Sequence, residues 1–155
     1  MSRLIDKIEL RPFKAEDFLG LELRAEDKGL RQQPEYVDYL KGNEVPGFCY
    51  TALLEGEVVG CGGVKPFWPG VGEAWAFFPA EKVKYKREIF YAAKKVIDRV
   101  EAENKLHRVQ AVVRADFPEA MGFMHHLGFE VEAKLTAYNE DKTDAFLYRR
   151  VNLNG

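Results

Sequence analysis

Cysteine is scarce in this sequence: only Cys49 and Cys61 occur among 155 residues. Both lie inside apolar runs that are typical of neighbouring strands. A secreted disulfide framework would need more pairs, and a metal site would need more ligands. We therefore expect two small, buried thiols in the reducing environment of the cytoplasm.

The sequence also lacks long apolar runs and an excess of charge of one sign. No stretch is long and apolar enough to span a membrane, and residues 1–7 have no signal-peptide core. The formal net charge is −2, which gives no overall attraction for nucleic acid or an anionic membrane. We expect a cytoplasmic protein that binds neither.

No internal repeat, low-complexity segment or linker interrupts the chain. Hydrophobic residues make up 46% and charged residues 31%, as in ordinary globular proteins. A length of 155 residues is enough for one hydrophobic core. We predict one domain that spans residues 1–155.

The hydrophobic pattern alternates between periods typical of strands and of helices. It predicts strands over 7–13, 48–54, 58–64, 73–78, 108–113, 129–138 and 144–151, and helices over 15–24, 35–41, 89–100 and 118–127. The strand-helix-strand unit at residues 73–113 implies one parallel crossover, whereas the hairpins imply antiparallel pairs. The fold class is therefore α/β (α+β mixed): a mostly antiparallel twisted sheet of about six or seven strands, flanked by about four helices.

Glycine positions refine this prediction. Glu55-Gly56 between two apolar runs favours a hairpin. Gly60, Gly62 and Gly63 lie inside the second run and do not open a helix, so they indicate a bulge or a close backbone approach rather than a nucleotide-binding loop. Pro66, Pro69, Gly70 and Gly72 mark the next turn.

The run from Val113 to Phe129 resembles a pattern of the GNAT superfamily of acyl-coenzyme A N-acyltransferases. The strand ends at Val113, Ala120 occupies the position of the family's alanine, and Gly128-Phe129 is the closing pair. The order of elements is similar to that family over essentially the whole chain. The matching residues serve packing and turns, so they indicate architecture rather than chemistry.

The resemblance implies transfer of an acetyl or other acyl group from acetyl-CoA to an amine, on a small molecule or a protein. The amine would attack the thioester directly, without an acyl-enzyme intermediate. The pantetheine arm of acetyl-CoA would lie along the backbone of Phe77 and Phe78, where two neighbouring strands splay apart. The pyrophosphate would face Val83, Lys84, Tyr85, Lys86, Arg87 and Glu88.

That last segment departs from the family, whose loop before the long helix carries glycines that let backbone N–H groups approach phosphate. Residues 79–88 contain no glycine; cations, including Lys84 and Arg87, are present instead. At a helix N-terminus such cations oppose the helix dipole unless an anion binds. Alternatively, the helix begins earlier, near Pro79, and the lysines lie on a solvated face.

The acceptor side also departs from the family. Met124 stands at the position of the tyrosine that protonates the leaving thiolate in many members, and Phe117 stands at that of the asparagine. His125 is rotated by roughly 100° from Met124 along a helix, so it points elsewhere. Tyr85 and Tyr138 are substitutes without positional support.

A general base is needed to take a proton from the attacking amine. Glu73 lies where some family members carry a glutamate; the alternative is an exposed carboxylate at a strand end. We expect no metal site, because His125 and His126 are adjacent rather than four residues apart. His107 is expected at a surface turn.

Two alternatives to an enzyme stay open. One is a degenerate GNAT-fold binding or structural protein without activity, since glycine-less, lysine-rich loops resemble those of phage and prophage members. The other is a small-ligand sensor that uses the same cleft. An aromatic patch around Phe67, Trp68 and Trp75 leaves a homodimer open as well.

Overall fold

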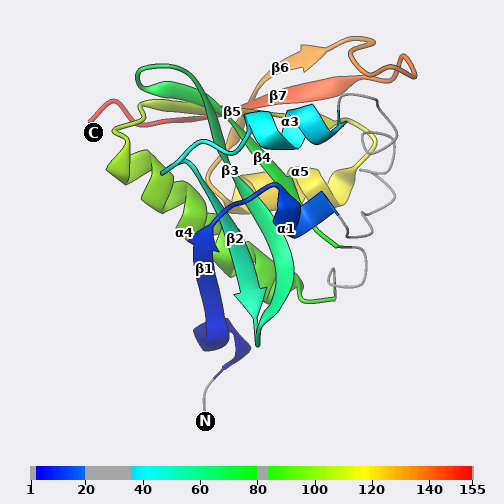
Figure 1. The fold of residues 1–155 in the computed structure, drawn as a ribbon. Helices are drawn as coiled ribbons and strands as arrows, with labels where there is room; N and C mark the ends of the chain where they lie inside the picture. The colour runs from blue at the N-terminus through cyan, green and yellow to red at the C-terminus, as the bar shows by residue number, and fades with distance from the viewer. Residues whose placement is uncertain (1–2, 20–35, 80–83, 155) are drawn as a thin grey trace.

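The computed structural model describes residues 3–19, 36–79 and 84–154 (Figure 1). Its elements follow the predicted order of strands and helices. They are η1 (Leu4–Lys7), β1 (Ile8–Pro12), α1 (Glu16–Leu19), α3 (Tyr36–Gly42), β2 (Cys49–Leu54), β3 (Glu57–Trp68), β4 (Val71–Phe77), α4 (Lys86–Glu103), β5 (Arg108–Arg114), α5 (Pro118–His126), β6 (Glu130–Leu135) and β7 (Ala145–Val151).

The strands form one seven-stranded sheet in the order β1-β2-β3-β4-β5-β7-β6. Every neighbouring pair is antiparallel except β4 and β5, which are parallel and joined by the α4 crossover. The predicted mixed, mostly antiparallel sheet and its single parallel crossover are therefore confirmed. Helices α4 and α5 lie against one face of this sheet, and α1 and α3 lie against the other (Figure 1).

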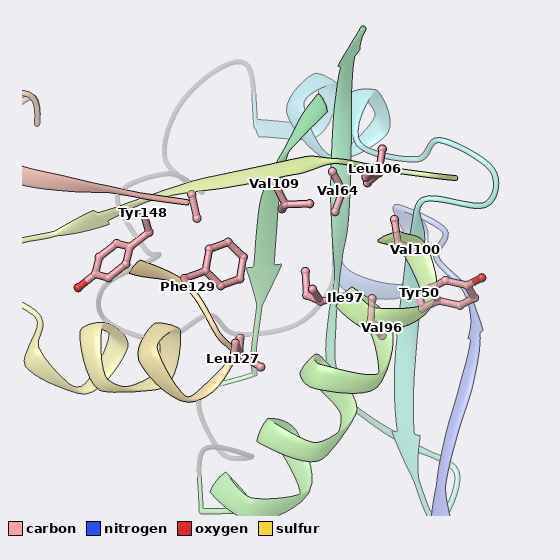
Figure 2. Packing of buried hydrophobic residues seen from close by; sticks show 11 residues of the cluster. Tyr50, Val64, Val96, Ile97, Val100, Leu106, Val109, Leu127, Phe129 and Tyr148 are labelled. Atoms are coloured by element: carbon pink, nitrogen blue, oxygen red, sulfur yellow. The ribbon is translucent and has the colours of Figure 1, made fainter. Parts of the chain in front are cut away.

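The larger hydrophobic core joins the sheet to α4 and to the segment that follows α5 (Figure 2). Helix α4 contributes Val96, Ile97 and Val100 at helical spacing, as predicted. Gly128 adopts a φ of +90° just after α5, and this reversal lets Phe129 enter the core, where it is 2% exposed. The predicted role of the Gly-Phe pair is thus confirmed as a packing role.

Positive φ values confirm the predicted hairpin turn at Glu55 and Gly56. A register shift beside Gly60 and the close approach of Gly63 to the Phe48 carbonyl confirm the bulge and the tight backbone packing of this segment. The predicted turn is confirmed at Pro69 and Gly70, where Gly70 has a φ of +87°, but it is shorter than expected. Strand β3 continues through Pro66 to Trp68, and Gly72 already belongs to β4. Pairing with β4 extends the strand, and a register shift between residues 66 and 68 accommodates the proline.

Cys49 and Cys61 are buried thiols outside any disulfide, as predicted. They lie in the smaller cluster between the sheet and α3, and burial raises the pKa of the Cys49 thiol. Beyond Leu19, the helix predicted over 15–24 lies outside the described residues. None of the described helices has the length and apolarity needed to cross a bilayer.

The aromatic patch predicted around residues 67–75 is smaller than expected. Phe67 and Trp68 at the end of β3 are 42% and 64% exposed. Trp75 instead packs edge-on against Phe13, with ring centroids 5.0 Å apart, on the sheet face that α3 covers. Only the tip of the β3–β4 hairpin is therefore an exposed aromatic surface in this region.

Candidate functional site

Strands β4 and β5 pair over only part of their length. The parallel ladder joins Val71 to Arg108, Gly72 to Val109 and Glu73 to Gln110, and it ends there. Both strands continue beyond this point, β4 to Phe77 and β5 to Arg114, without a further ladder between them. The two strands therefore diverge toward their carboxyl ends, which is the splay expected from the resemblance.

Glu73 is the last residue of β4 in that ladder. It lies where the two strands begin to separate, which is the closed end of the divergence. Its side chain is half-buried rather than fully exposed. Burial raises the pKa of the Glu73 carboxyl, while a hydrogen bond with the Gln110 side chain and the charge of Lys65 partly oppose this increase. The expected alternative, an exposed strand-end carboxylate, does not describe this environment.

Phe77 and Phe78 lie at the open end of the divergence, and their rings contact different parts of the molecule. Phe77 is 4% exposed and packs edge-on against Tyr39 of α3, with ring centroids 6.1 Å apart. Phe78 lies over Gly60, where a Cβ atom would meet its ring at 2.7 Å, and edge-on against Phe123 of α5 at 6.4 Å. These aromatic contacts fix the backbone along which the pantetheine arm was expected.

Helix α4 begins at Lys86, so the alternative in which it begins near Pro79 is wrong. Tyr85 is the N-cap residue and makes no capping hydrogen bond with its side chain. Lys84 lies over the Tyr85 ring at 5.3 Å, and Lys86 and Arg87 occupy the first turn, exposed to solvent. An uncapped helix N-terminus with these cations is a suitable site for an anion.

The other residues expected at the phosphate site are Val83 and Glu88. Val83 lies outside the described residues. Glu88 is half-buried in the first turn of α4, where a carboxylate favours the helix dipole. Lys86 lies 3.8 Å from Glu119, in the first turn of α5, so the starts of the two helices are neighbours.

The residues expected on the acceptor side offer no proton donor at the family's position. Met124 is half-buried against the larger core, and Phe117 is the N-cap residue of α5. His125 lies edge-on against the buried Tyr148 ring, with ring centroids 5.6 Å apart. Tyr138 is 57% exposed on the turn after β6.

Sequence reasoning did not identify Gln110, which lies beside Glu73 on β5. Its amide oxygen accepts hydrogen bonds from Arg108 at 3.2 and 3.3 Å. Arg108 in turn donates to both carboxylate oxygens of Glu132 on β6, at 2.8 and 2.9 Å. The polar alternation of β5 gave a weak signal of this group, but its partners depend on the strand register.

A cluster of three or more His, Cys, Asp or Glu side chains suited to a metal ion does not occur within residues 3–19, 36–79 and 84–154. His107 is exposed just before β5, at the expected surface turn. The chemistry available at the divergence of β4 and β5 is therefore that of one half-buried carboxylate and a cationic helix N-terminus.

Solved structures, acetyltransferases among them, share this fold. Ard1 from Thermoplasma volcanium superposes with a TM-score of 0.76 at 22% identity, over 96% of this chain and 99% of that one. A mutant of the spermidine N-acetyltransferase SpeG from Vibrio cholerae gives 0.73 at 14% identity, over 96% and 98%. A ribosomal-protein-S5-alanine acetyltransferase from Vibrio fischeri gives 0.69 at 16% identity, over 96% and 94%.

Such likenesses at low identity show the fold alone. A comparison with curated proteins gave no match. The family model of the acetyltransferase (GNAT) family matches residues 15–129. This range includes β4, α4, the whole of α5 and the Gly-Phe pair. On this match and the shared fold, the chain belongs to the acetyltransferase (GNAT) family.

Proposed function

We propose that this protein is an N-acetyltransferase that moves an acetyl group from acetyl-CoA to an amine, with residues 1–155 acting as one domain. The observation that carries the proposal is the end of the β4–β5 ladder at Glu73. A half-buried carboxylate lies at the closed end of the divergence, and an uncapped, cationic helix start follows its open end. Family membership supports the same conclusion.

In this proposal the cofactor lies between β4 and β5 with its phosphates at the start of α4. The side of β4 beyond Glu73 that faces β5 carries no ladder with it, which suits hydrogen bonding to the amides of a pantetheine arm. Lys84, Lys86 and Arg87 would attract the phosphates together with the first N–H groups of the helix. When bound, the cofactor supplies an activated acetyl thioester.

Glu73 is the proposed general base. An amine that enters as an ammonium ion must lose a proton before its lone pair can attack the thioester carbonyl. The Glu73 carboxylate takes that proton; the new C–N bond forms as the C–S bond breaks, the sulfur leaves as thiolate, and the nitrogen loses its second proton to water. Met124 cannot protonate this sulfur, so the thiolate takes its proton from water. A thiol with an ordinary pKa of about 8.5 leaves readily enough as a thiolate for this to suffice.

The acceptor is proposed as an amine on a small molecule or a protein. Spermidine and an alanine residue are named as acceptors for two of the proteins that share the fold, and both present amines. A homodimer is also proposed, through the exposed rings of Phe67 and Trp68. Analytical ultracentrifugation tests this by comparing the solution mass of Trp68→Ser with that of the unmodified protein. Equal masses would show that these rings do not form a dimer interface.

A second candidate function is favoured by the lack of glycine in residues 79–88. Without glycine, side chains crowd the approach to the α4 N–H groups, and the protein would be a GNAT-fold binding or structural module of the phage or prophage type. Met124 and Phe117, which stand in place of polar family residues, favour the same candidate.

Thermal unfolding with and without acetyl-CoA separates the two candidates. A ligand at 100 times its dissociation constant adds about 2.7 kcal/mol to the free energy of unfolding. The enzyme should therefore melt several degrees higher with millimolar acetyl-CoA. An unchanged melting temperature would exclude the enzyme and favour the binding module.

Glu73→Gln tests the base. The variant should bind acetyl-CoA as the unmodified protein does. Its turnover of an amine substrate at neutral pH should fall about 10²-fold or more. Glu57→Gln, a substitution of a glutamate at the start of β3, is the control and should retain full turnover. Full turnover in Glu73→Gln would show that Glu73 is only a strand residue.

A further inference from the structure

A continuous row of polar side chains crosses the sheet on the face opposite α4. It begins at Lys65 on β3, passes through Glu73 and Gln110, and continues through Arg108 to Glu132 on β6. Cross-strand register places the first three side chains beside one another, since Lys65 pairs with Glu73 and Glu73 with Gln110. The row thus connects the proposed base on β4 to a charged pair formed by Arg108 on the neighbouring strand β5 and Glu132 on β6.

The hydrogen bonds of this row have a fixed direction. A guanidinium can only donate, so Arg108 requires the Gln110 Oε1 atom as the acceptor for its bonds of 3.2 and 3.3 Å. That leaves the Gln110 Nε2 group to donate toward the Glu73 carboxylate, which lies beside it in the β4–β5 register and whose pKa Gln110 lowers. Reversing the amide would place an oxygen against the Glu73 carboxylate and an N–H group against a cation.

Arg108 is itself held in place. Its two terminal nitrogens donate to the two Glu132 oxygens at 2.8 and 2.9 Å, a bidentate geometry that restricts rotation of the guanidinium. Arg149 of β7 lies 3.6 Å from Glu132 on the other side. Arg108 and Glu132 side chains are only 25% and 33% exposed, so solvent competes weakly for these bonds.

We propose that Gln110 is a positioning residue that holds the Glu73 carboxylate at the closed end of the β4–β5 divergence, and that the Arg108–Glu132 pair fixes the orientation of its amide. This inference rests on the proposed function for its role in turnover, but the contact itself does not depend on catalysis. Gln110 would prevent the carboxylate from rotating away from an incoming amine. It would also stabilise the ionised form that accepts the proton.

The test measures the titration of Glu73 directly, by NMR of its side-chain carboxyl carbon in the folded protein. Burial raises the pKa of Glu73, and the charged or polar groups that face it are Lys65 on β3 and Gln110 on β5. Gln110→Met removes the donor while keeping the length of the side chain. We expect the Glu73 midpoint to rise by about one pH unit, because a hydrogen bond to a charged group is lost.

Two more variants examine the direction of the bonds. Arg108→Lys keeps the charge but loses the bidentate pair, so the amide becomes free to reverse and the Glu73 midpoint should rise by a smaller amount. Arg99→Met is the control, because Arg99 lies on α4, on the other side of the sheet from this row, and pairs with Glu103. Its Glu73 midpoint should stay that of the unmodified protein.

Kinetics add a second readout. In Gln110→Met the acidic limb of the kcat/KM profile should move upward in parallel with the NMR midpoint, while KM for acetyl-CoA stays unchanged. An unmoved NMR midpoint in both Gln110→Met and Arg108→Lys would overturn the positioning role, whatever the activity. A raised midpoint in a protein that never binds acetyl-CoA would instead support the contact and refute the proposed enzyme. If Gln110→Met does not fold, Gln110→Asn, which retains the amide but shortens its reach, decides by the same midpoint.

Discussion

The start of α4 combines two opposing electrostatic requirements. Lys86 and Arg87 are the first two residues of the helix and carry positive charge where the dipole is also positive. In the protein alone this arrangement is unfavourable, whereas a bound phosphate would make it favourable. We predict that the double substitution Lys86→Gln with Arg87→Gln stabilises the free protein and weakens its binding of coenzyme A.

The size of the stabilisation follows from the geometry. Each exposed cation in the first turn costs about 0.3–1 kcal/mol. Loss of the Lys86–Glu119 pair offsets little, because the side chains are 73% and 74% exposed and such pairs contribute at most about 1 kcal/mol. Glutamine matches both residues in helix propensity. A net gain of about 0.5–1.5 kcal/mol should raise the melting temperature by roughly 1–6 °C for a chain of this size.

Melting curves at low and high salt, with calorimetric titration of coenzyme A, test both parts. At about 1 M salt the screening length falls to about 3 Å, so the gain in melting temperature should shrink. Affinity for coenzyme A should fall about tenfold or more, since charge-assisted hydrogen bonds to phosphate are lost. Lys95→Gln, in the exposed middle of the same helix, is the control and should change neither quantity.

Two outcomes for the double variant would contradict this prediction. If the double variant melts lower than the unmodified protein and binds coenzyme A equally well, the cations neither oppose the dipole nor contact phosphate. If it melts higher but binds equally well, the helix start is an unfavourable feature without a ligand, and the phosphates of any cofactor lie elsewhere.

Three further predictions concern stability. Gly122→Ala should raise the free energy of unfolding by about 1 kcal/mol, because Gly122 is exposed inside α5 with open space around it. Gly128→Ala should lower it by about 1–2 kcal/mol, because Gly128 has a φ of +90°, which side chains rarely adopt. Urea titrations of the two variants measure both changes. Phe129→Ala should lower it by about 3–5 kcal/mol in the same titrations, since the ring is 2% exposed. Hydrogen bonds from Thr143 and Arg114 hold the pKa of Asp141 far below its usual range, so its stabilisation is present above a pH of about 3.8 and is lost as pH falls through the folded pKa. Asp141→Asn should therefore melt lower than the unmodified protein at pH 7, and melting curves at pH 2 should show a smaller difference.

Much of the fold could be predicted because its signals are local. Helical spacing in α4, the glycine that ends α5 and the Glu55-Gly56 turn each act within a few residues. The end of β3 could not be predicted in this way. Pro66 usually marks a turn, but it can occupy a strand where a bulge relieves the missing N–H group, and only the partner strand shows that a ladder continues past it.

In the candidate site, too, some residues could be predicted from the sequence and others depend on strand pairing. Glu73 and the cations of α4 were identified by position along the chain, and the structure adds where the helix begins. Gln110 could not be identified, because a shift of one residue in the β4–β5 register would place its side chain on the opposite face of the sheet. The three pairs of that ladder therefore determine two features at once. They set Glu73 beside Gln110, and they end where the strands diverge, so that the proposed base lies at the closed end of the space that a cofactor would enter.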